Sequence, residues 1–442
     1  MPGGLPALLS RPAKWPGVAL AAAVFAFLDV LDVLLCLVYA ALDAVLEDSP
    51  VACFCHRTHG AEGVSDTLYL RRSAFRDALL ALLRTVGVGK RTTNASPEKA
   101  RSPRWSDCGC ARCLAWRSAG GGRLHFVAGK EEPTPTKGTT IFRFSVTTRR
   151  GPGDDAIFIH GFTSSSSFWA QTVFPELAAT TNRRLLAVDL LGFGDSPKPA
   201  NCAYTLRDHV EAIERSLIDP LGLTSFHLVS HSMGCTVAIA LAARNPARVR
   251  SITLVAPPYF LPCEERASQV ALTRLAEKKL WPPLVFGTAV MSWYEHIGRT
   301  VCFVVCKNHR VWEWLIRILT RKSGVDFVVR DLTRHTHHSA WNTMHNVICG
   351  GAGVQDRNLE VLAAAGVPVR VVHGDGDQVV PVECSSRHLK SKLPRAELRL
   401  LGGRDHRTVV FGREKEFAEE LREFWSGCEN REAMVMDGCV RT

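Results

Sequence analysis

Short, nearly continuous apolar runs recur along the chain from residue 156 onward. They cover 156–160, 185–189, 226–230, 252–255 and 369–373, with a weaker run at 398–401. Stretches with apolar residues at helical spacing separate most of them. Apolar runs of this length that alternate with helices are typical of parallel strands buried on both faces. The pattern therefore predicts an α/β fold with a mostly parallel sheet, together with one alternating strand at 141–147.

The strand pattern stops between residues 257 and 354, where Trp, Phe and Leu recur at helical spacings. We expect this interval to be a helical cap inserted above the carboxyl edge of the sheet. The insertion would divide the core into a first half at 139–256 and a second half at 355–426. Residues 427–442 are expected to form a C-terminal tail.

The N-terminal segment, 1–52, contains a long apolar stretch with a basic flank before it. Asp29, Asp32 and Asp43 interrupt this stretch. A charged residue at the centre of a membrane-spanning helix costs about 2.5–3.5 kcal/mol, which disfavours a plain spanning helix. The pattern favours a secretory signal or signal anchor. An interfacial amphipathic anchor and a packed structural helix are the alternatives.

Residues 53–138 are expected to be a partly irregular, Cys-containing extension, in which 72–84 has the apolar stripe of a helix. Cys53 and Cys55 directly follow the apolar segment and are candidates for lipid attachment. Asn94 begins an Asn-Ala-Ser sequon for N-glycosylation. These features favour the secretory pathway, with the protein outside the cell or on the outer face of the plasma membrane.

The net charge of +11 suits an anionic membrane surface or an acidic cell wall as well as a nucleic acid. The chain has no RNP, zinc-finger or helix-turn-helix pattern. We therefore expect a membrane surface or cell wall as partner, and no nucleic acid.

Cys108, Cys110 and Cys113 form a Cys-x-Cys-x-x-Cys cluster. A closed zinc site needs four ligands, and His125 is the histidine that could complete it. Disulfides or lipidated thiols are favoured instead, so we expect no metal and no cofactor.

The sequence Ser-His-Ser-Met-Gly at 230–234 follows a predicted strand and precedes an Ala-rich helix. This is the context of a nucleophile elbow, which places Ser232 at the tip of a sharp turn. The positions two before and two after the nucleophile must be small. Gly234 satisfies this, and Ser230 stands where glycine is usual.

A serine nucleophile needs a base and an acid, which follow it in the chain order Ser, acid, His. Asp377 ends a late strand and precedes Gln-Val-Val-Pro, the position that the acid normally holds. Asp375, between two glycines, is better explained as a turn residue. His406 follows the last predicted strand and is the expected base.

The developing oxyanion needs main-chain donors. The N–H of Met233, directly after the nucleophile, is the first candidate. The second is the N–H of Phe162, in the loop that follows the first buried strand.

Several stretches outside these motifs carry a more specific resemblance. They read SDTLY (65–69), RWSDC (104–108), FIHGF (158–162), AVDLLG (187–192), WPP (281–283), SWYEH (292–296) and PVEC (381–384). In these the whole chain resembles the plant BODYGUARD-type α/β-hydrolases, probable lysophospholipases linked to cuticle (cutin) formation. The resemblance implies an α/β-hydrolase fold, the same triad, an extracellular address and an acyl-lipid substrate.

We therefore expect a serine hydrolase that cleaves acyl esters of lipids and takes part in cuticle formation in the epidermal cell wall. Resolution of the acyl-enzyme by an alcohol would instead make it an acyltransferase that builds a lipid polyester. A non-catalytic binding protein on the same fold is the alternative of a different class.

Overall fold

The computed structural model describes residues 15–47, 63–68, 104–111, 113, 123–129, 155–259, 267–276, 283–321 and 324–440. Its described strands form one seven-stranded sheet in the order β1-β3-β2-β4-β5-β6-β7. Their bounds are β1 Phe126–Gly129, β2 Asp155–Ile159, β3 Leu185–Val188, β4 Phe226–His231, β5 Val249–Val255, β6 Val369–Gly374 and β7 Glu397–Leu401. All neighbours pair in parallel except β1, which runs antiparallel to β3. The predicted fold class is confirmed.

The edge strand β1 lies within the segment expected to be an extension of the core. It pairs Val127 with Ala187 of β3. The expected strand at 141–147 and the expected helix at 72–84 lie outside the described residues.

Alternate residues of the strands enter two separate cores. Ile157 and Ile159 of β2 face one core, and Ala156 and Phe158 face the other. The first core is covered by α6 (Leu206–Ile213), α8 (Met233–Arg244), α16 (Gln355–Ala364) and α17 (Ser386–Lys392). The second is covered by α4 (Ser167–Ala170), α5 (Val173–Ala178) and α18 (Glu414–Val440). This two-sided burial explains the continuous apolar strands. Helix α18 continues through most of the segment expected to be a tail.

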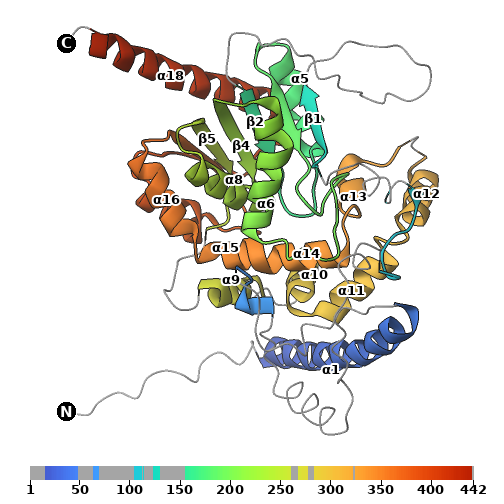
Figure 1. Cartoon of the computed structure of the whole chain (residues 1–442). Helices are drawn as coiled ribbons and strands as arrows, with labels where there is room; N and C mark the ends of the chain where they lie inside the picture. Colours follow the sequence, from blue (N-terminus) through green and yellow to red (C-terminus); the bar gives the residue numbers. More distant parts are fainter. Residues whose placement is uncertain are drawn as a thin grey trace, which may run out of the picture.

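Helices follow one another through the cap interval, and its described residues contain no strand. They are α9 (Ala267–Ala276), α10 (Pro283–Trp293), α11 (Glu295–Val304), α12 (His309–Thr320), α13 (Phe327–Asp331), α14 (His337–Thr343), a π-helical turn at Met344–Cys349 and α15 (Gly350–Ala352). An isolated bridge between Phe193 and His335 joins the cap to a loop of the core. Most of these helices lie below the sheet in the view of Figure 1.

Helix α1 (Trp15–Leu46) packs along the cap, on the side away from the sheet (Figure 1). Asp32 accepts hydrogen bonds from the N–H groups of His296 and Ile297, at the N-terminus of α11 (2.8 and 3.2 Å). Asp43 accepts hydrogen bonds from both terminal nitrogens of the Arg299 guanidinium (2.8 and 2.6 Å). A helix N-terminus and a guanidinium are suitable partners for buried carboxylates. Two of the three aspartates that interrupt the apolar segment, Asp32 and Asp43, therefore dock this helix onto the cap.

Candidate active site

Ser232 lies at the turn between β4 and α8, with φ 51° and ψ −128°. A positive φ in a non-glycine residue is strained and is typical of a nucleophile elbow. A Cβ atom on Gly234 would lie 2.4 Å from the carbonyl oxygen of His160, so only glycine fits this position. Ser230 is fully buried and donates to the Thr253 carbonyl (3.4 Å), which explains how serine fits where glycine is usual.

The structure brings Ser232, His406 and Asp377 together at the carboxyl edge of the sheet. His406 Nε2 lies 2.9 Å from Ser232 Oγ, and His406 Nδ1 lies 2.7 Å from Asp377 Oδ2. The three residues follow three different strands, β4, β7 and β6. Both distances are within the range for proton transfer from a serine through a histidine that an acid orients.

The environment of Asp377 keeps its carboxylate ionised. Burial acts to raise its pKa, but hydrogen bonds from His373 and His406 and from the main chain outweigh burial and hold the pKa well below its ordinary value. Its Oδ1 accepts from the N–H groups of Val379 and Val380, each at 2.8 Å. An ionised acid at Nδ1 leaves Nε2 of His406 as the acceptor for the Ser232 proton.

The loop that carries Phe162 lies against the nucleophile. A Cβ atom on Gly161 would be 3.1 Å from Ser232 Cβ. His160 Nδ1 donates to the Gly161 carbonyl (2.7 Å), and His160 Nε2 accepts from the N–H of Leu190 (2.9 Å), so this loop is held from behind. Met233 begins α8 directly after the nucleophile. The loop of one expected oxyanion donor, Phe162, therefore lies against Ser232, and the other donor, Met233, follows Ser232 in the chain.

Several known proteins are similar to this chain. A family model described as alpha/beta hydrolase fold matches residues 157–276. The chain is similar to a solved haloalkane dehalogenase loop variant from Bradyrhizobium elkanii (TM-score 0.48, 18% identity), over 65% of this chain and 93% of that chain. It is 38% identical to "Probable lysophospholipase BODYGUARD 1" of Arabidopsis thaliana, over 91% of this chain and 94% of the relative. It is 46% identical to "Probable lysophospholipase BODYGUARD 4" of the same plant, over 95% of this chain and all of the relative.

The chain belongs to the BODYGUARD family. The resemblance found in its sequence is confirmed, because these relatives match the N-terminal segments and the cap as well as the hydrolase core. The aspartates that dock α1 onto the cap and the elbow around Ser232 thus lie within one BODYGUARD-family chain.

Two histidines of this BODYGUARD-family chain have a part in the site that the sequence did not show. His231 Nε2 donates to the main-chain carbonyl of His406 (2.9 Å), and its ring stacks on Phe168. Burial lowers the pKa of His231 to about 3, so the ring is neutral. His373 donates from Nε2 to Asp377 Oδ2 (3.0 Å) and accepts at Nδ1 from Ser386 Oγ (2.6 Å). It therefore supports the acid directly.

The competing carboxylate, Asp375, is exposed and lies outside the hydrogen-bonded chain of the triad. Its Oδ1 accepts from the N–H of Gly403 (2.7 Å), which is the contact of a turn residue. The acid and base loops also join through their main chains, because the N–H of Gly376 donates to the carbonyl of Arg404 (2.9 Å).

The cap reaches the loop beside the nucleophile through α13. Ser165 Oγ donates to Asp331 Oδ2, and Arg330 donates to Ser167 Oγ (3.0 Å). Burial raises the pKa of Asp331 to about 6. Phe327 of the same helix stacks on Phe411, in the loop after His406. Helix α13 of this BODYGUARD-family protein thus contacts both the loop after Phe162 and the loop after His406.

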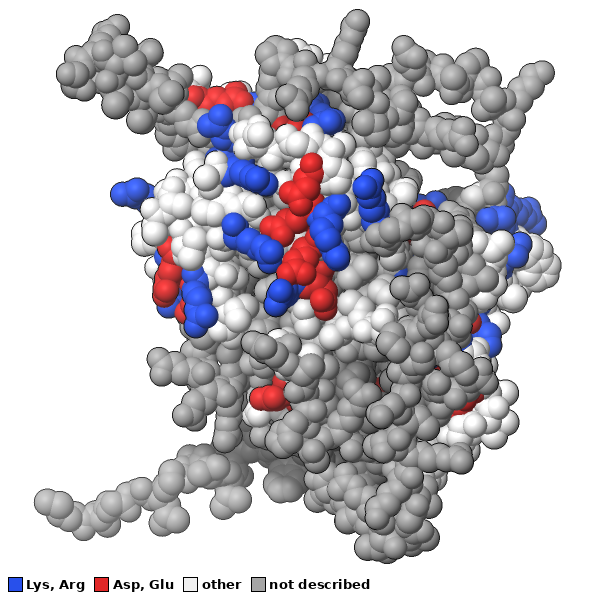
Figure 2. Space-filling model, viewed as in Figure 1, with Lys and Arg blue, Asp and Glu red and all other residues white. Residues whose placement is uncertain are grey.

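The remaining predicted positions have different outcomes. Cys53, Cys55 and Asn94 lie outside the described residues. His125, the possible fourth ligand of the cysteine cluster, lies elsewhere: its Nδ1 is 2.9 Å from Asp189 Oδ2, in a structural loop of the core. On the face shown in Figure 2, Lys and Arg alternate with Asp and Glu over the described surface. The positive net charge therefore produces no single basic field on the described part of this face.

Proposed function

We propose that the chain is a serine hydrolase that cleaves acyl esters of lipids. The observation that carries the proposal is the unbroken chain of hydrogen bonds from Ser232 through His406 to Asp377. Ser232 Oγ attacks the ester carbonyl while its proton moves to His406 Nε2. The N–H groups of Met233 and Phe162 stabilise the oxyanion.

The reaction then proceeds through an acyl-enzyme on Ser232. Its formation releases the alcohol, which takes the proton from His406. Water then attacks the acyl-enzyme and gives a proton to His406. As the acyl–oxygen bond breaks, His406 returns this proton to Ser232 Oγ and the fatty acid is released. Asp377 stays ionised throughout and stabilises the imidazolium.

The substrate class is supported by the relatives and by the cap. BODYGUARD 1 and BODYGUARD 4 are named as probable lysophospholipases. A lysophospholipid carries one acyl ester, so cleavage gives a free fatty acid and a glycerophospho-alcohol. The resemblance further suggests that these products or their analogues serve cuticle formation in the plant epidermal cell wall.

The surface of α1 supports action at a membrane of the secretory pathway or at the outer face of the plasma membrane. The described residues contain one helix, Leu20–Leu46, that is long enough and apolar enough to span a bilayer. Its Asp32 and Asp43 are nevertheless buried on the cap, while large apolar side chains face outward. The exposed ones are Leu20, Phe27, Val30, Leu34, Val38, Leu42, Val45 and Leu46. A helix with one docked face and one apolar exposed face suits an interfacial anchor that stays on the mature protein.

Catalysis is tested with a fluorophosphonate probe and a lysophospholipid assay. The wild-type protein should be labelled and should release fatty acid from a lysophospholipid, while Ser232→Ala should do neither and keep its fold. Ser165→Ala is the matched control, because it also removes one serine hydroxyl near the site. Probe labelling that persists in Ser232→Ala would identify another serine as the nucleophile and overturn the proposal.

Membrane association is tested by flotation with vesicles that contain anionic phospholipid. Leu34→Asp and Val38→Asp place charges on the exposed face of α1 and should reduce the fraction that floats. Leu400→Asp, at an exposed position of β7, is the control and should float like the wild type. Equal flotation of all four proteins would refute the anchor, and a mature chain that lacks α1 would refute its retention.

A further inference from the structure

The cysteine cluster of the extension meets a histidine of the cap. The sulfur atoms of Cys108, Cys110 and Cys113 and a ring nitrogen of His309 all lie within 4.8 Å of one another. His309 Nε2 is 3.4 Å from Cys113 Sγ and 3.6 Å from Cys110 Sγ. His309 begins α12 and is buried, and the cysteines are half-buried. Four metal-ligating atoms from segments 196 residues apart therefore converge at one point.

The spacing of these atoms is that of a tetrahedral zinc site. Zinc lies about 2.3 Å from a thiolate sulfur and about 2.0–2.1 Å from an imidazole nitrogen. In a regular tetrahedron these lengths put sulfur and nitrogen about 3.6 Å apart. The two sulfur–nitrogen distances at His309 agree with this value. Three Cys and one His are also a ligand set that structural zinc prefers.

The surroundings of His309 support a metal ligand as well. Its other ring nitrogen, Nδ1, is 3.2 Å from Glu313 Oε1, one turn along α12. Glu313 is in turn 3.7 Å from Arg317. A histidine that binds zinc through one nitrogen usually donates from the other to a carboxylate, which fixes the ring and raises its basicity.

We propose that Cys108, Cys110, Cys113 and His309 bind one zinc ion, which fastens the N-terminal extension to helix α12 of the cap. Four protein ligands leave no open position, so the ion is structural rather than catalytic. This assignment departs from the expectation of disulfides and no metal. A disulfide would use only two of the three sulfur atoms. It would not explain why His309 Nε2 points toward the cysteine sulfurs.

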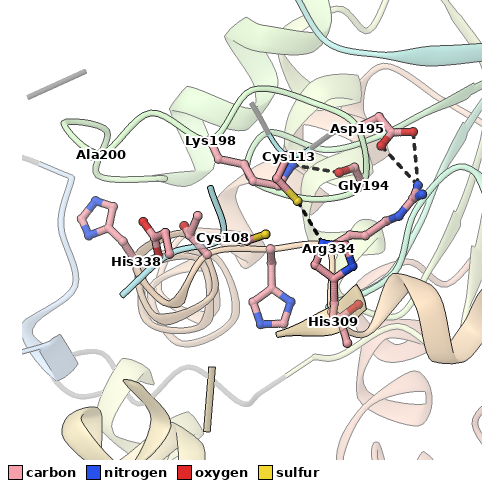
Figure 3. A pocket seen from close by; sticks show the side chains of 13 residues that line it. Cys108, Cys113, Gly194, Asp195, Lys198, Ala200, His309, Arg334 and His338 are labelled. Carbon is pink, nitrogen blue, oxygen red and sulfur yellow. Dashed lines mark hydrogen bonds and ion pairs between the residues drawn. The ribbon is translucent and has the colours of Figure 1, made fainter. Parts of the chain in front are cut away.

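A second group of thiols lies close by. Cys302, Cys306 and His335 also bring three candidate ligand atoms within 4.8 Å of one another. Figure 3 shows Cys108, Cys113 and His309 at a pocket that Lys198, Arg334 and His338 also line. The first group has four ligand atoms and a carboxylate behind its histidine, whereas the second has three ligand atoms among the described residues. We therefore assign the ion to the first group.

The experiment measures metal on the full-length protein in detergent, purified without added chelator. Mass spectrometry should find one zinc ion per chain, and Cys113→Ser and His309→Ala should lose it. Cys384→Ser, which changes a half-buried cysteine of neither group, should keep it. His309→Cys preserves a ligand and should retain zinc, which separates loss of a ligand from loss of fold.

Cobalt provides a second readout. Replacement of zinc by Co²⁺ should produce thiolate-to-cobalt charge-transfer absorption and the d–d bands of a tetrahedral ion, both absent in Cys113→Ser. If Cys306→Ser loses the ion and Cys113→Ser keeps it, the ion belongs to the second group and the assignment is overturned. Absence of any bound metal, or a disulfide within Cys108, Cys110 and Cys113 in protein isolated from plant tissue, would also overturn it. Two ions per chain, one lost with each group, would support the first site and add a second.

Discussion

His231 donates a hydrogen bond from Nε2 to the main-chain carbonyl oxygen of His406, at 2.9 Å. The residue before the candidate nucleophile thus holds the backbone of the candidate base. The two rings lie 4.9 Å apart. Because His231 is neutral and buried, this bond does not change with pH in the working range of an esterase.

Replacement of His231 should impair catalysis through the position of His406. We expect His231→Ala to lower kcat roughly 10- to 100-fold with little change in KM, because small displacements of a catalytic group are costly. His231→Gln, whose amide can still donate to the carbonyl, should recover part of the rate. His227→Ala, which removes another buried histidine of β4, controls for general loss of packing. The same loss of kcat in His227→Ala would contradict the positioning role.

Replacement of the two neighbouring aspartates should have unequal effects. Asp377→Asn should lower kcat about 10⁴-fold, because an amide favours the wrong tautomer of the base. Asp375→Asn should change kcat only a few-fold, since the Asp375 side chain accepts a hydrogen bond from the N–H of Gly403, away from His406. Steady-state kinetics with a soluble ester would measure both, and the reverse ranking would identify Asp375 as the acid.

The burial of Asp331, in helix α13, should make the cap sensitive to pH. Burial raises the pKa of Asp331 from 3.8 to about 6, so between these values the folded state binds more protons than the unfolded state. Stability is therefore lost as pH rises through this window and is constant above it. Asp331→Asn does not titrate, and its advantage over the wild type should grow to at most about 3 kcal/mol above pH 6.

Thermal unfolding from pH 4 to pH 8 would measure this advantage as a difference in Tm. Asp326→Asn, an exposed position at the start of the same helix, is the control and should show no such trend. A difference between Asp331→Asn and wild type that does not vary with pH would show that Asp331 is ionised throughout.

The ion pair between α1 and the cap should contribute strongly to stability. Arg299→Ala leaves Asp43 buried with one of its cationic partners missing, and loss of one partner of a buried pair costs about 3–5 kcal/mol. Arg207→Ala removes an exposed pair with Glu211 and should cost less than about 1 kcal/mol. Tm and limited proteolysis around α1 would compare the two. Similar values for both variants would mean that α1 is not docked as the structure shows.

Catalytic efficiency should rise with acyl chain length if the cap forms a wall of the substrate pocket. Each buried methylene contributes about 0.8 kcal/mol, so four additional carbons should favour the transition state by about 3 kcal/mol, up to the depth of the pocket. A series of p-nitrophenyl esters from acetyl to palmitoyl, kept below micelle formation, would measure this. A maximum at acetyl would make the enzyme a short-chain esterase and remove the lipid assignment.

Features that depend on local pattern could be predicted from the amino-acid sequence. Strands buried on both faces have to be continuously apolar, so β2 to β6 were visible as runs of Val, Ile, Leu and Phe. The elbow demands small residues around Ser232, and the order of strands then placed Asp377 and His406 at the same edge. The family was visible in motifs of the extension and cap, since these lie outside the common core.

Relationships between distant segments became visible only in the folded chain. Strand β1 is four residues long and alternates weakly, so its partner β3 defines it. In the sequence, Asp32 and Asp43 are charged residues at unfavourable positions in an apolar helix. The structure shows that residues of α11 bind both carboxylates. His309 lies 196 residues from Cys113, so local spacing did not connect the two, and His125 was the only histidine considered as a fourth ligand. The periodicity of apolar residues shows which face of a single element is buried. The pairing of charges, thiols and histidines depends instead on which elements the fold brings together.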